Sequence, residues 1–363
     1  MKRVAVLLTM MVVSLGLVPQ AHASTWPRGS SYRTFREYRT SVHVVTVHLA
    51  KRSLRTMPAE QNFPMRHHGG SVPQLGKRYH AKIAINGDFK MKVDGYVSQP
   101  KHAWVKNREI WTTGVGRGGV GLVLNNRHHA KIGPTSILAL LRDSDNRTHR
   151  IDRVNQGHEG VAVFTPRGGG TQHPVDGRCY VRLANQDGWS WNDRGLAQRT
   201  YTVQTAQCGQ AIPVLDGTIV VESGASLDLA GPVTWTQNLG IKYATEVVAG
   251  VPQVLTNGNV TGPTHARAML GPDGTFYDRN PRTAIGVNRK GTTLFLMAVD
   301  GRLHNQAGVT LPMLGRLMKR VGAHNAVNYD GGGGTLLWRS GKGILNNPSE
   351  HYARPALVGI GIF

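Results

Sequence analysis

The sequence predicts an α+β fold, a sheet-rich mixed α/β domain with few helices. The 363 residues include 45 Gly and 18 Pro, and only 7% are aromatic, which favours many turns and short strands over a helical bundle. Apolar residues make up 40% of the chain and charged residues 18%, the usual balance of a globular protein. Short β-branched runs also recur between glycine-rich turns, as expected of strands.

The first 23 residues have the pattern of a secretory signal peptide. Lys2 and Arg3 precede an apolar run over residues 4–18, and residues 21–23 read Ala-His-Ala, a small-residue cleavage site. An uncleaved membrane anchor is the alternative, but the run is shorter than the roughly 20 residues that a spanning helix needs. We therefore expect a secreted or extracytoplasmic protein with no transmembrane span after the signal is removed.

We expect the mature chain to consist of two parts. Residues 24–79 form a basic N-terminal segment that we expect to pack on the main domain, residues 80–363. The whole chain has 43 Lys and Arg against 21 Asp and Glu, a formal net charge of +22. Solvated surface charge is one interpretation, and attraction of a polyanion is the other. We do not expect nucleic acid as the physiological partner, because export separates the protein from cellular nucleic acid and the sequence has no nucleic-acid-binding motif.

Two cysteines are present, Cys179 and Cys208. Outside the cytoplasm a pair of thiols becomes oxidised, so we predict one disulfide between them. Two buried free thiols are the alternative.

Strand signals are spread over the first two thirds of the sequence. Apolar, β-branched runs predict strands at residues 42–49, 82–85, 120–124, 160–164, 201–204 and 218–221. Glycine-rich turns such as residues 168–170 separate them. We find no internal repeat.

The last third is more regular. Residues 292–299 predict a strand, residues 326–329 another, and one clear helix lies between them at about 310–322. Thr310 can cap this helix and Gly322 can end it. Its apolar stripe has i, i+3, i+4, i+7 spacing and consists of Leu314, Leu317, Met318 and Val321. If the two strands are parallel neighbours joined by this crossover, Asp300 and Asp330, which follow them, share one edge of the sheet.

Asp330 is followed by four glycines and Thr335. Such a run is costly in chain entropy, so a folded domain keeps it where the backbone must pass close to something or take a positive φ. Its amides can form an anion-binding nest, to which Thr335 adds a hydroxyl. A flexible surface turn is the alternative, and a Walker loop is excluded because no Gly-Lys-Ser/Thr follows.

Other polar positions are weaker signals. Arg282 and Arg302 offer planar cations suited to phosphate, although surface ion pairs are the commoner role of arginine. Asn86 and Asp88 flank a glycine after a predicted strand, which is also ordinary turn chemistry. Asn347 lies in a polar loop before a proline.

Metal chemistry has little support in the sequence. The 16 histidines show no HExxH motif and no Cys/His zinc spacing, and no Gly-x-Ser-x-Gly elbow indicates a serine hydrolase. We predict no metal ligands and no required cofactor, while a bound divalent cation near the aspartates stays open.

Taken in order, these motifs resemble the phosphodiester glycosidase family. The resemblance spans about residues 80–362. It rests on seven stretches that keep their sequence order: residues 86–89, 250–258, 282–286, 299–302, 308–311, 325–333 and 347–349. It implies a hydrolase that cleaves the bond between a sugar and a phosphodiester. The family usually has Ser where Gly334 stands, which removes a hydroxyl or shifts it to Thr335.

The resemblance also assigns expected roles to the residues. Those expected at the phosphate are Arg282 and the amides of Gly331, Gly332 and Gly333. Those expected at the sugar hydroxyls or the anomeric centre are Asn86, Asn328 and Asp330. The remaining members of the predicted substrate-binding set are Asp88, Thr283, Arg302, Thr335 and Asn347. Because glycoside cleavage generally uses two carboxyl groups, we predict Asp330 and Asp300 as the catalytic pair.

The positive charge and the predicted export suggest where such an enzyme acts. Teichoic-acid-like or other phosphoglycan polymers outside a bacterial cell are abundant phosphodiesters, and a basic protein would concentrate near them. The alternative is a non-catalytic module that grips an anionic glycan in the same cleft.

Overall fold

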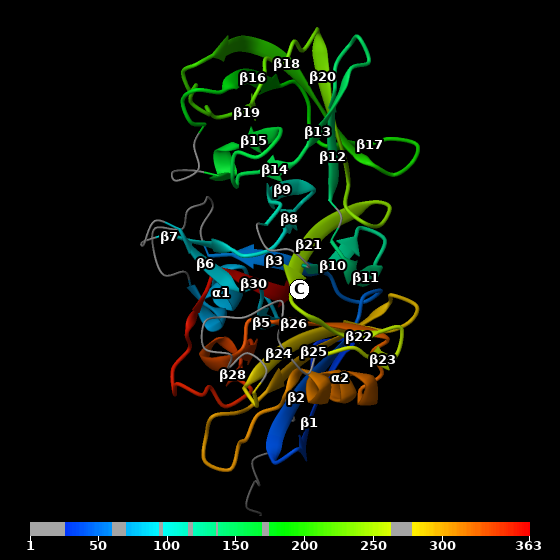
Figure 1. Ribbon diagram of the computed structural model, residues 1–363. Helices are drawn as coiled ribbons and strands as arrows, with labels where there is room; N and C mark the ends of the chain where they lie inside the picture. The colour runs from blue at the N-terminus through cyan, green and yellow to red at the C-terminus, as the bar shows by residue number, and fades with distance from the viewer. Residues whose placement is uncertain are drawn as a thin grey trace, which may run out of the picture.

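The computed structural model describes residues 26–59, 70–93, 97–114, 119–135, 137–168, 174–262 and 278–363. Within these ranges the chain forms six β-sheets and two α-helices (Figure 1), which confirms the predicted sheet-rich α+β class. Each predicted strand coincides with an observed one. The signal-like segment, residues 1–23, and residues 169 and 170 of the glycine-rich turn lie outside the described residues.

A seven-stranded antiparallel sheet contains the two strands that Asp300 and Asp330 follow. In spatial order its strands are β1 (Ser30–Glu37), β2 (Thr40–His48), β25 (Thr293–Val299), β24 (Arg282–Val287), β26 (Asn325–Tyr329), β22 (Gln253–Thr256) and β23 (Asn259–Val260). Its centre is apolar on both faces, so the strands read as continuous hydrophobic runs.

Helix α2 (Leu311–Arg320) covers one face of this sheet, as Figure 1 shows. The Thr310 side chain caps it by accepting a hydrogen bond from the Met313 amide, and Gly322, at φ +103°, follows its end. The apolar stripe packs on strand residues in one cluster that includes Leu314, Met318 and Phe295. The predicted helix at about 310–322 is therefore confirmed.

A five-stranded sheet packs on the face of the seven-stranded sheet opposite helix α2. Its order is β28 (Gly343–Ile344), β27 (Leu337–Arg339), β5 (Ile83–Asn86), β30 (Val358–Ile362) and β3 (Leu54–Pro58). Its side chains join those of the seven-stranded sheet in one buried cluster that includes Ile85, Ile360 and Val327. Two strand ends from distant parts of the sequence, those of β5 and β26, meet where these sheets pack together.

The second helix, α1 (Val72–Arg78), lies on the outer face of this five-stranded sheet. Ser71 and Gln74 form a capping box at its start. Gly76 lies so close to the Trp338 ring that a Cβ there would collide with it. The helix has only seven residues, too few to show a period, and the sequence did not predict it.

The other strands build two further sheets. The five-stranded one has the order β11 (Ala130–Pro134), β10 (Val120–Asn125), β21 (Ala244–Gly250), β8 (Trp104–Lys106) and β9 (Glu109–Thr112). The nine-stranded one comprises β13 (Thr148–Ile151), β12 (Leu138–Arg142), β20 (Pro232–Asn238), β18 (Ala197–Cys208), β16 (Cys179–Asn185), β19 (Thr218–Ser223), β15 (Ala162–Phe164), β14 (Arg153–Val154) and β17 (Ser190–Trp191), the last paired with β18.

In Figure 1 the nine-stranded sheet lies at the top, away from the seven-stranded sheet, with β8, β9 and β21 between them. Its hydrophobic cluster also includes residues of β8, β9, β10 and β21 from the neighbouring sheet. Cys179 on β16 lies directly opposite Cys208 on β18, and the two form the predicted disulfide. Two small pairings complete the described strands: β29 (Pro355–Ala356) with β4 (Gly70–Ser71), and β6 (Lys90–Val93) with β7 (Val97–Pro100). Neither helix in the described ranges has the length and apolarity to cross a membrane.

Candidate active site

The strand order places Asp300 and Asp330 on one edge of the seven-stranded sheet, but not on neighbouring strands. β24 lies between β25 and β26 and is antiparallel to both, so β25 and β26 run parallel and end at the same edge. The expectation that these strands are direct neighbours is wrong, because β24 is inserted between them. Two strand spacings separate the aspartate backbones by roughly 10 Å, and Arg282, the first residue of β24, lies between them.

Asn86 joins the two sheets at this edge. Its Nδ2 donates to the main-chain oxygen of Asp330 (2.7 Å), and its Oδ1 accepts from the Thr283 hydroxyl (2.8 Å) and from the Leu336 amide (3.0 Å). The side chain is buried. Three residues of the predicted site, Asn86, Thr283 and Asp330, are therefore brought together, with Asn86 holding the backbone of Asp330 in place.

The glycine loop after Asp330 is closely surrounded. Gly332 takes φ +57°, and its amide donates to the Pro281 oxygen (3.0 Å), so this amide already has a protein partner. A Cβ on Gly334 would lie 2.7 Å from Oδ2 of Asp330, and a Cβ on Gly333 would collide with the Glu350 carboxylate. The run of glycines thus lets two carboxylates approach the main chain.

The Asp330 carboxyl has a raised pKa. Burial is the main cause, the negative charge of Asp88 adds to it, and Arg354, Lys90 and the Gly331 backbone oppose it, which leaves the pKa at about 6. The residue is nonetheless partly exposed. A carboxyl group that titrates near neutral pH and reaches solvent is suited to proton transfer.

Cationic side chains surround the outer face of the loop. The exposed Arg302 donates from Nε to Oδ1 of Asn280 (2.9 Å), and its guanidinium lies 3.0 Å from the Cβ position of Gly332. Arg354 forms an ion pair with Glu350. Although burial acts to raise it, the pKa of Glu350 is lowered by hydrogen bonds from Tyr352 and Arg354 and by the charges of Arg354 and Arg302.

Several of these groups escaped the sequence-based prediction. Lys90 and Arg354 lie outside the recognised motifs, and no local pattern marks them. His102 was missed as well: its Nδ1 lies 2.8 Å from Oδ1 of Asp88, and its amide donates to Oδ2 (2.7 Å). Both side chains of this pair are buried. Asp88 therefore lies in a closed polar pair beside the site.

Two predicted site residues are buried below the surface. Asp300 is 0% exposed, and its carboxylate accepts from the Asn347 amide (2.9 Å) and from Asn347 Nδ2 (2.7 Å), with Nε2 of His43 3.3 Å away. Arg282 is 3% exposed and donates to the main-chain oxygens of Val309 (3.3 Å) and Asp278 (3.0 Å). In this structure both side chains organise protein backbone and polar groups.

Asn328 and Thr335 are also buried. Asn328 donates from Nδ2 to the Val251 oxygen (2.8 Å), while its Oδ1 and the Thr335 hydroxyl have no hydrogen-bond partner among the described residues. No group of three or more His, Cys, Asp or Glu side chains that could hold a metal ion occurs in the described ranges. That no cofactor is required stays a prediction.

A family model described as phosphodiester glycosidase matches residues 176–363. No curated protein matches the chain. Among solved structures, a hypothetical protein from Synechocystis aligns over 92% of this chain with a TM-score of 0.65 and 20% identity. This chain spans 62% of the length of that protein.

Two further structures are similar. A protein from Burkholderia pseudomallei K96243 aligns over 89% of this chain and 74% of its own, with a TM-score of 0.63 and 18% identity. The catalytic domain of zebrafish N-acetylglucosamine-1-phosphodiester alpha-N-acetylglucosaminidase, auto-inhibited by its pro-peptide, aligns over 92% of this chain and 81% of its own, with a TM-score of 0.45 and 16% identity. The Synechocystis and Burkholderia structures show that the fold is shared.

Proposed function

Because this chain belongs to the phosphodiester glycosidase family, we propose that it hydrolyses the bond between the anomeric carbon of a sugar and an oxygen of a phosphodiester. Water adds across that bond, and the products are a free sugar and a phosphate monoester. The observation that carries the proposal is the Asp330 carboxyl, whose pKa of about 6 accompanies partial exposure at a glycine loop lined by cations.

In this mechanism Asp330 acts in its ionised form. It takes a proton from the water that attacks the anomeric carbon. The bond between that carbon and the phosphodiester oxygen breaks, and the oxygen leaves with the phosphate. A phosphate monoester leaves more readily than an alcohol, so it needs less protonation, and a single carboxylate with electrostatic stabilisation suffices. The predicted partner, Asp300, is assigned a positioning role, because its oxygens are occupied by Asn347.

The charges around the loop suit a diester. The charges of Lys90 and Arg354 act on Asp330, and those of Arg354 and Arg302 act on Glu350, so these cations stabilise negative charge at the loop. Arginine gives a phosphodiester two parallel donors, and we assign Arg302 to the phosphate, a role that the family resemblance implied for Arg282. Arg354, which donates to Glu350 through Nε and Nη2, adds its charge beside it.

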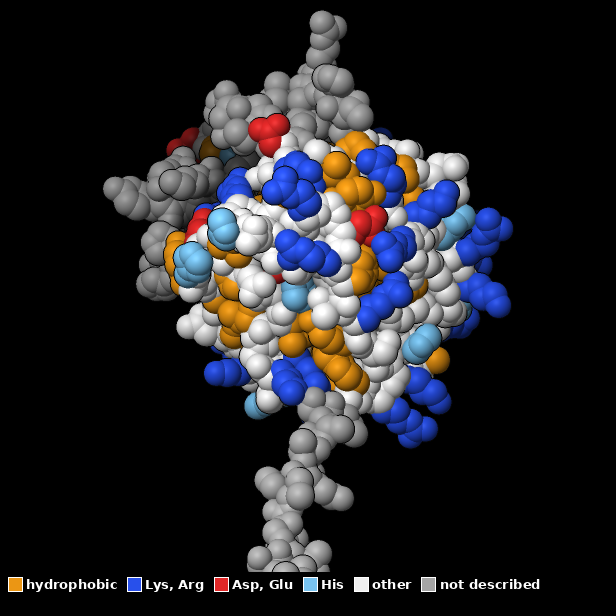
Figure 2. Space-filling view, turned by 90° about the horizontal axis from the view of Figure 1, so that it is seen from below, with side chains coloured by type: hydrophobic (Ala, Val, Ile, Leu, Met, Phe, Trp, Pro, Cys, Tyr) orange, Lys and Arg blue, Asp and Glu red, His pale blue; other side chains and the backbone are white. Residues whose placement is uncertain are grey.

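The proposed setting is outside the cell, on a phosphoglycan such as a wall polymer. The signal-like N-terminus and the net charge of +22 support this setting. Figure 2 shows Lys and Arg side chains spread over the face seen from below, with few acidic ones between them. Exposed members on β1 and α2 include Arg33, Arg36, Arg316 and Lys319. Such a surface would concentrate a polyanion near the protein.

Release of free sugar from a sugar 1-phosphodiester tests the activity. We expect release by the natural protein and a loss of at least about a hundredfold in Asp330→Asn, because general-base catalysis typically contributes that much or more. A second candidate function, a non-catalytic glycan-binding module, is favoured by Gly334, where the family usually has Ser. Tight binding of the diester, with the ligand recovered unchanged by mass spectrometry, would support the module and contradict hydrolysis.

A further inference from the structure

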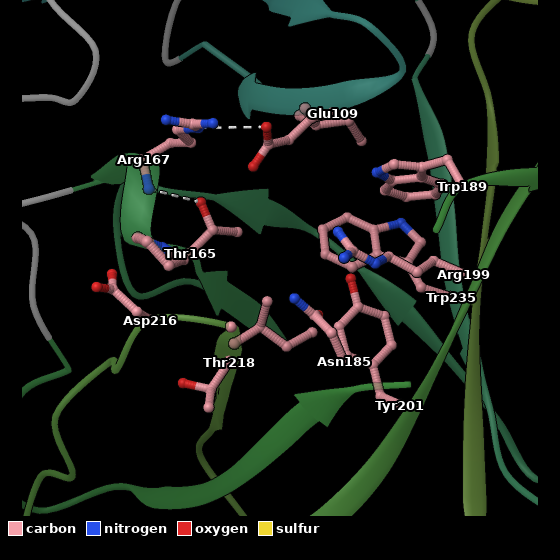
Figure 3. Close-up of a pocket in the computed structure, with 14 residues that line it drawn as sticks. Glu109, Thr165, Arg167, Asn185, Trp189, Arg199, Tyr201, Asp216, Thr218 and Trp235 are labelled. Carbon is pink, nitrogen blue, oxygen red and sulfur yellow. Dashed lines mark hydrogen bonds and ion pairs between the residues drawn. The ribbon is translucent and has the colours of Figure 1, made fainter. Parts of the chain in front are cut away.

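A separate pocket lies between the nine-stranded sheet and β9, on structure that the proposed hydrolysis does not use. Its volume is ≈ 420 Å³, within the range of small-molecule sites. Figure 3 shows its side chains converging on one open space: Glu109 and Arg167 above, Trp189 and Trp235 on one side, Tyr201 below. None of the side chains assigned above to the candidate active site lines it.

One wall of this pocket is aromatic. The rings of Trp189 and Trp235 meet edge to face with centroids 5.8 Å apart, and Tyr201 lies 6.4 Å from Trp235. Trp235 and Tyr201 are each 2% exposed, so packing fixes their orientation. Trp189 packs against this fixed pair and is itself partly exposed, so it offers a rigid aromatic surface at low conformational cost, suited to the C–H face of a pyranose ring.

Hydrogen-bonding capacity in the pocket is unused. Among the described residues, the indole nitrogens of Trp189 and Trp235 and the Oδ1 atom of Asn185 are buried without a hydrogen-bond partner. Figure 3 shows the Trp189 nitrogen facing the open space. Leaving a buried donor or acceptor unpaired is costly. A ligand with several hydroxyl groups supplies acceptors for both indoles and a donor for the amide oxygen.

The charges that line the pocket balance. Glu109 pairs with Arg167 at 3.2 Å, and Arg199 and Asp216 add one charge of each sign. Burial raises the pKa of the Tyr201 hydroxyl, which therefore stays neutral. The lining has no excess charge to select an ion.

We propose that this pocket binds an uncharged pyranose sugar. The aromatic wall covers one face of the ring, while the two indoles and Asn185 bond its hydroxyls. The site is independent of the Asp330 chemistry. It would give the protein a second hold on a glycan, through a sugar unit that carries no phosphate.

The test is titration of the full ¹⁵N-labelled chain with three uncharged probes, methyl glucoside, N-acetylglucosamine and cellobiose, observed at the side-chain N–H signals of its seven tryptophans. We expect at least one probe to shift the Trp189 and Trp235 signals saturably. Trp189→Phe and Trp235→Phe identify those two signals. Glucose 1-phosphate should bind more weakly than methyl glucoside, because the lining has no net positive charge.

Variants separate binding from folding. Trp189→Ala and Asn185→Ala should each weaken binding about tenfold or more, the equivalent of one lost hydrogen bond near 1.4 kcal/mol. Trp191→Ala is the matched control, because Trp191 does not line the pocket. Asp330→Asn should bind the sugar like the natural protein, so a failure of hydrolysis leaves this result untouched. The proposal is overturned if no probe shifts the two indoles saturably, or if binding persists in both pocket variants.

Discussion

The Cβ position of Gly334 lies 2.7 Å from Oδ2 of Asp330, closer than a real Cβ approaches an oxygen. The absence of a side chain at 334 therefore leaves room for the carboxylate in this position. Because the crowded atom is the end of a side chain, the carboxylate can rotate away from an added methyl group while the loop keeps its shape.

Gly334→Ala should consequently reduce activity more than stability. We expect kcat/KM to fall about tenfold, since a displacement of the base by a fraction of an ångström misaligns the attacking water, and the free energy of unfolding to change by less than about 1 kcal/mol. Gly334→Ser adds a hydroxyl donor beside the ionised carboxylate, which should lower the pKa of Asp330 and shift the acid limb of the pH–rate profile to lower pH. Unchanged rates in Gly334→Ala would mean that the carboxylate position does not matter.

The Asn86 side chain supports the site from the neighbouring sheet. Asn86→Ala removes three hydrogen bonds, two of them buried, and leaves the Thr283 hydroxyl and the Leu336 amide without these partners. We expect a loss of about 2–4 kcal/mol in the free energy of unfolding, measured by denaturant titration. Asn126→Ala, at an exposed side chain, is the control and should change it by less than about 0.5 kcal/mol. Equal stability of both variants would remove Asn86 as the link between the sheets.

Arg302 is assigned to the phosphate, so its loss should weaken substrate binding. Arg302→Gln is expected to raise KM about tenfold, and Arg302→Lys should recover only part of this, because an ammonium group lacks the bidentate fork. KM of the natural enzyme should also rise with salt. Arg194→Gln makes the same charge change at an exposed position in the turn between β17 and β18 and serves as the control. A similar KM in both variants would contradict the assignment.

Burial of Asp330 should cost stability at neutral pH. Its folded pKa, about 6, is above the ordinary value of 3.8, so the folded state binds the proton more tightly than the unfolded state. Stability therefore falls as pH rises from about 4 through 6. The free energy of unfolding of Asp330→Asn should match that of the natural protein near pH 4 and exceed it by about 1–3 kcal/mol at pH 8. Asp193→Asn, at an exposed aspartate, should show no such trend; the same trend in both variants would point to a general charge effect.

Local signals predicted much of the fold. Helix α2 has a cap, an apolar stripe and a terminal glycine within 13 residues. The β-branched strand β2 and the apolar strand β25 are evident from composition. Helix α1 has one capping box and seven residues, so no periodicity distinguishes it from a loop. Strand order is a property of the whole chain, and nothing local indicates that β24 separates β25 from β26.

Local motifs also made the site predictable in outline. Asn86, Thr283 and Asp330 belong to ordered motifs, and the structure brings them together. The burial of Arg282 and Asp300 depends on their neighbours in space, Val309 and Asn347 among them, which no spacing reveals. Lys90 and Arg354 join the site only because the strand-end loops converge there. The sugar pocket could not be predicted, because its lining residues are spread from Glu109 to Trp235 and form no motif.

The central claim is that ionised Asp330 acts on a sugar phosphodiester, and the pH dependence of free-sugar release measures it most directly. For the natural protein we expect kcat/KM to rise with pH through an apparent pKa of about 6 and to level off above it. Asp330→Asn should lack this limb and release sugar at least about a hundredfold more slowly. Release by Asp330→Asn at the natural rate, with the same limb, would contradict the account.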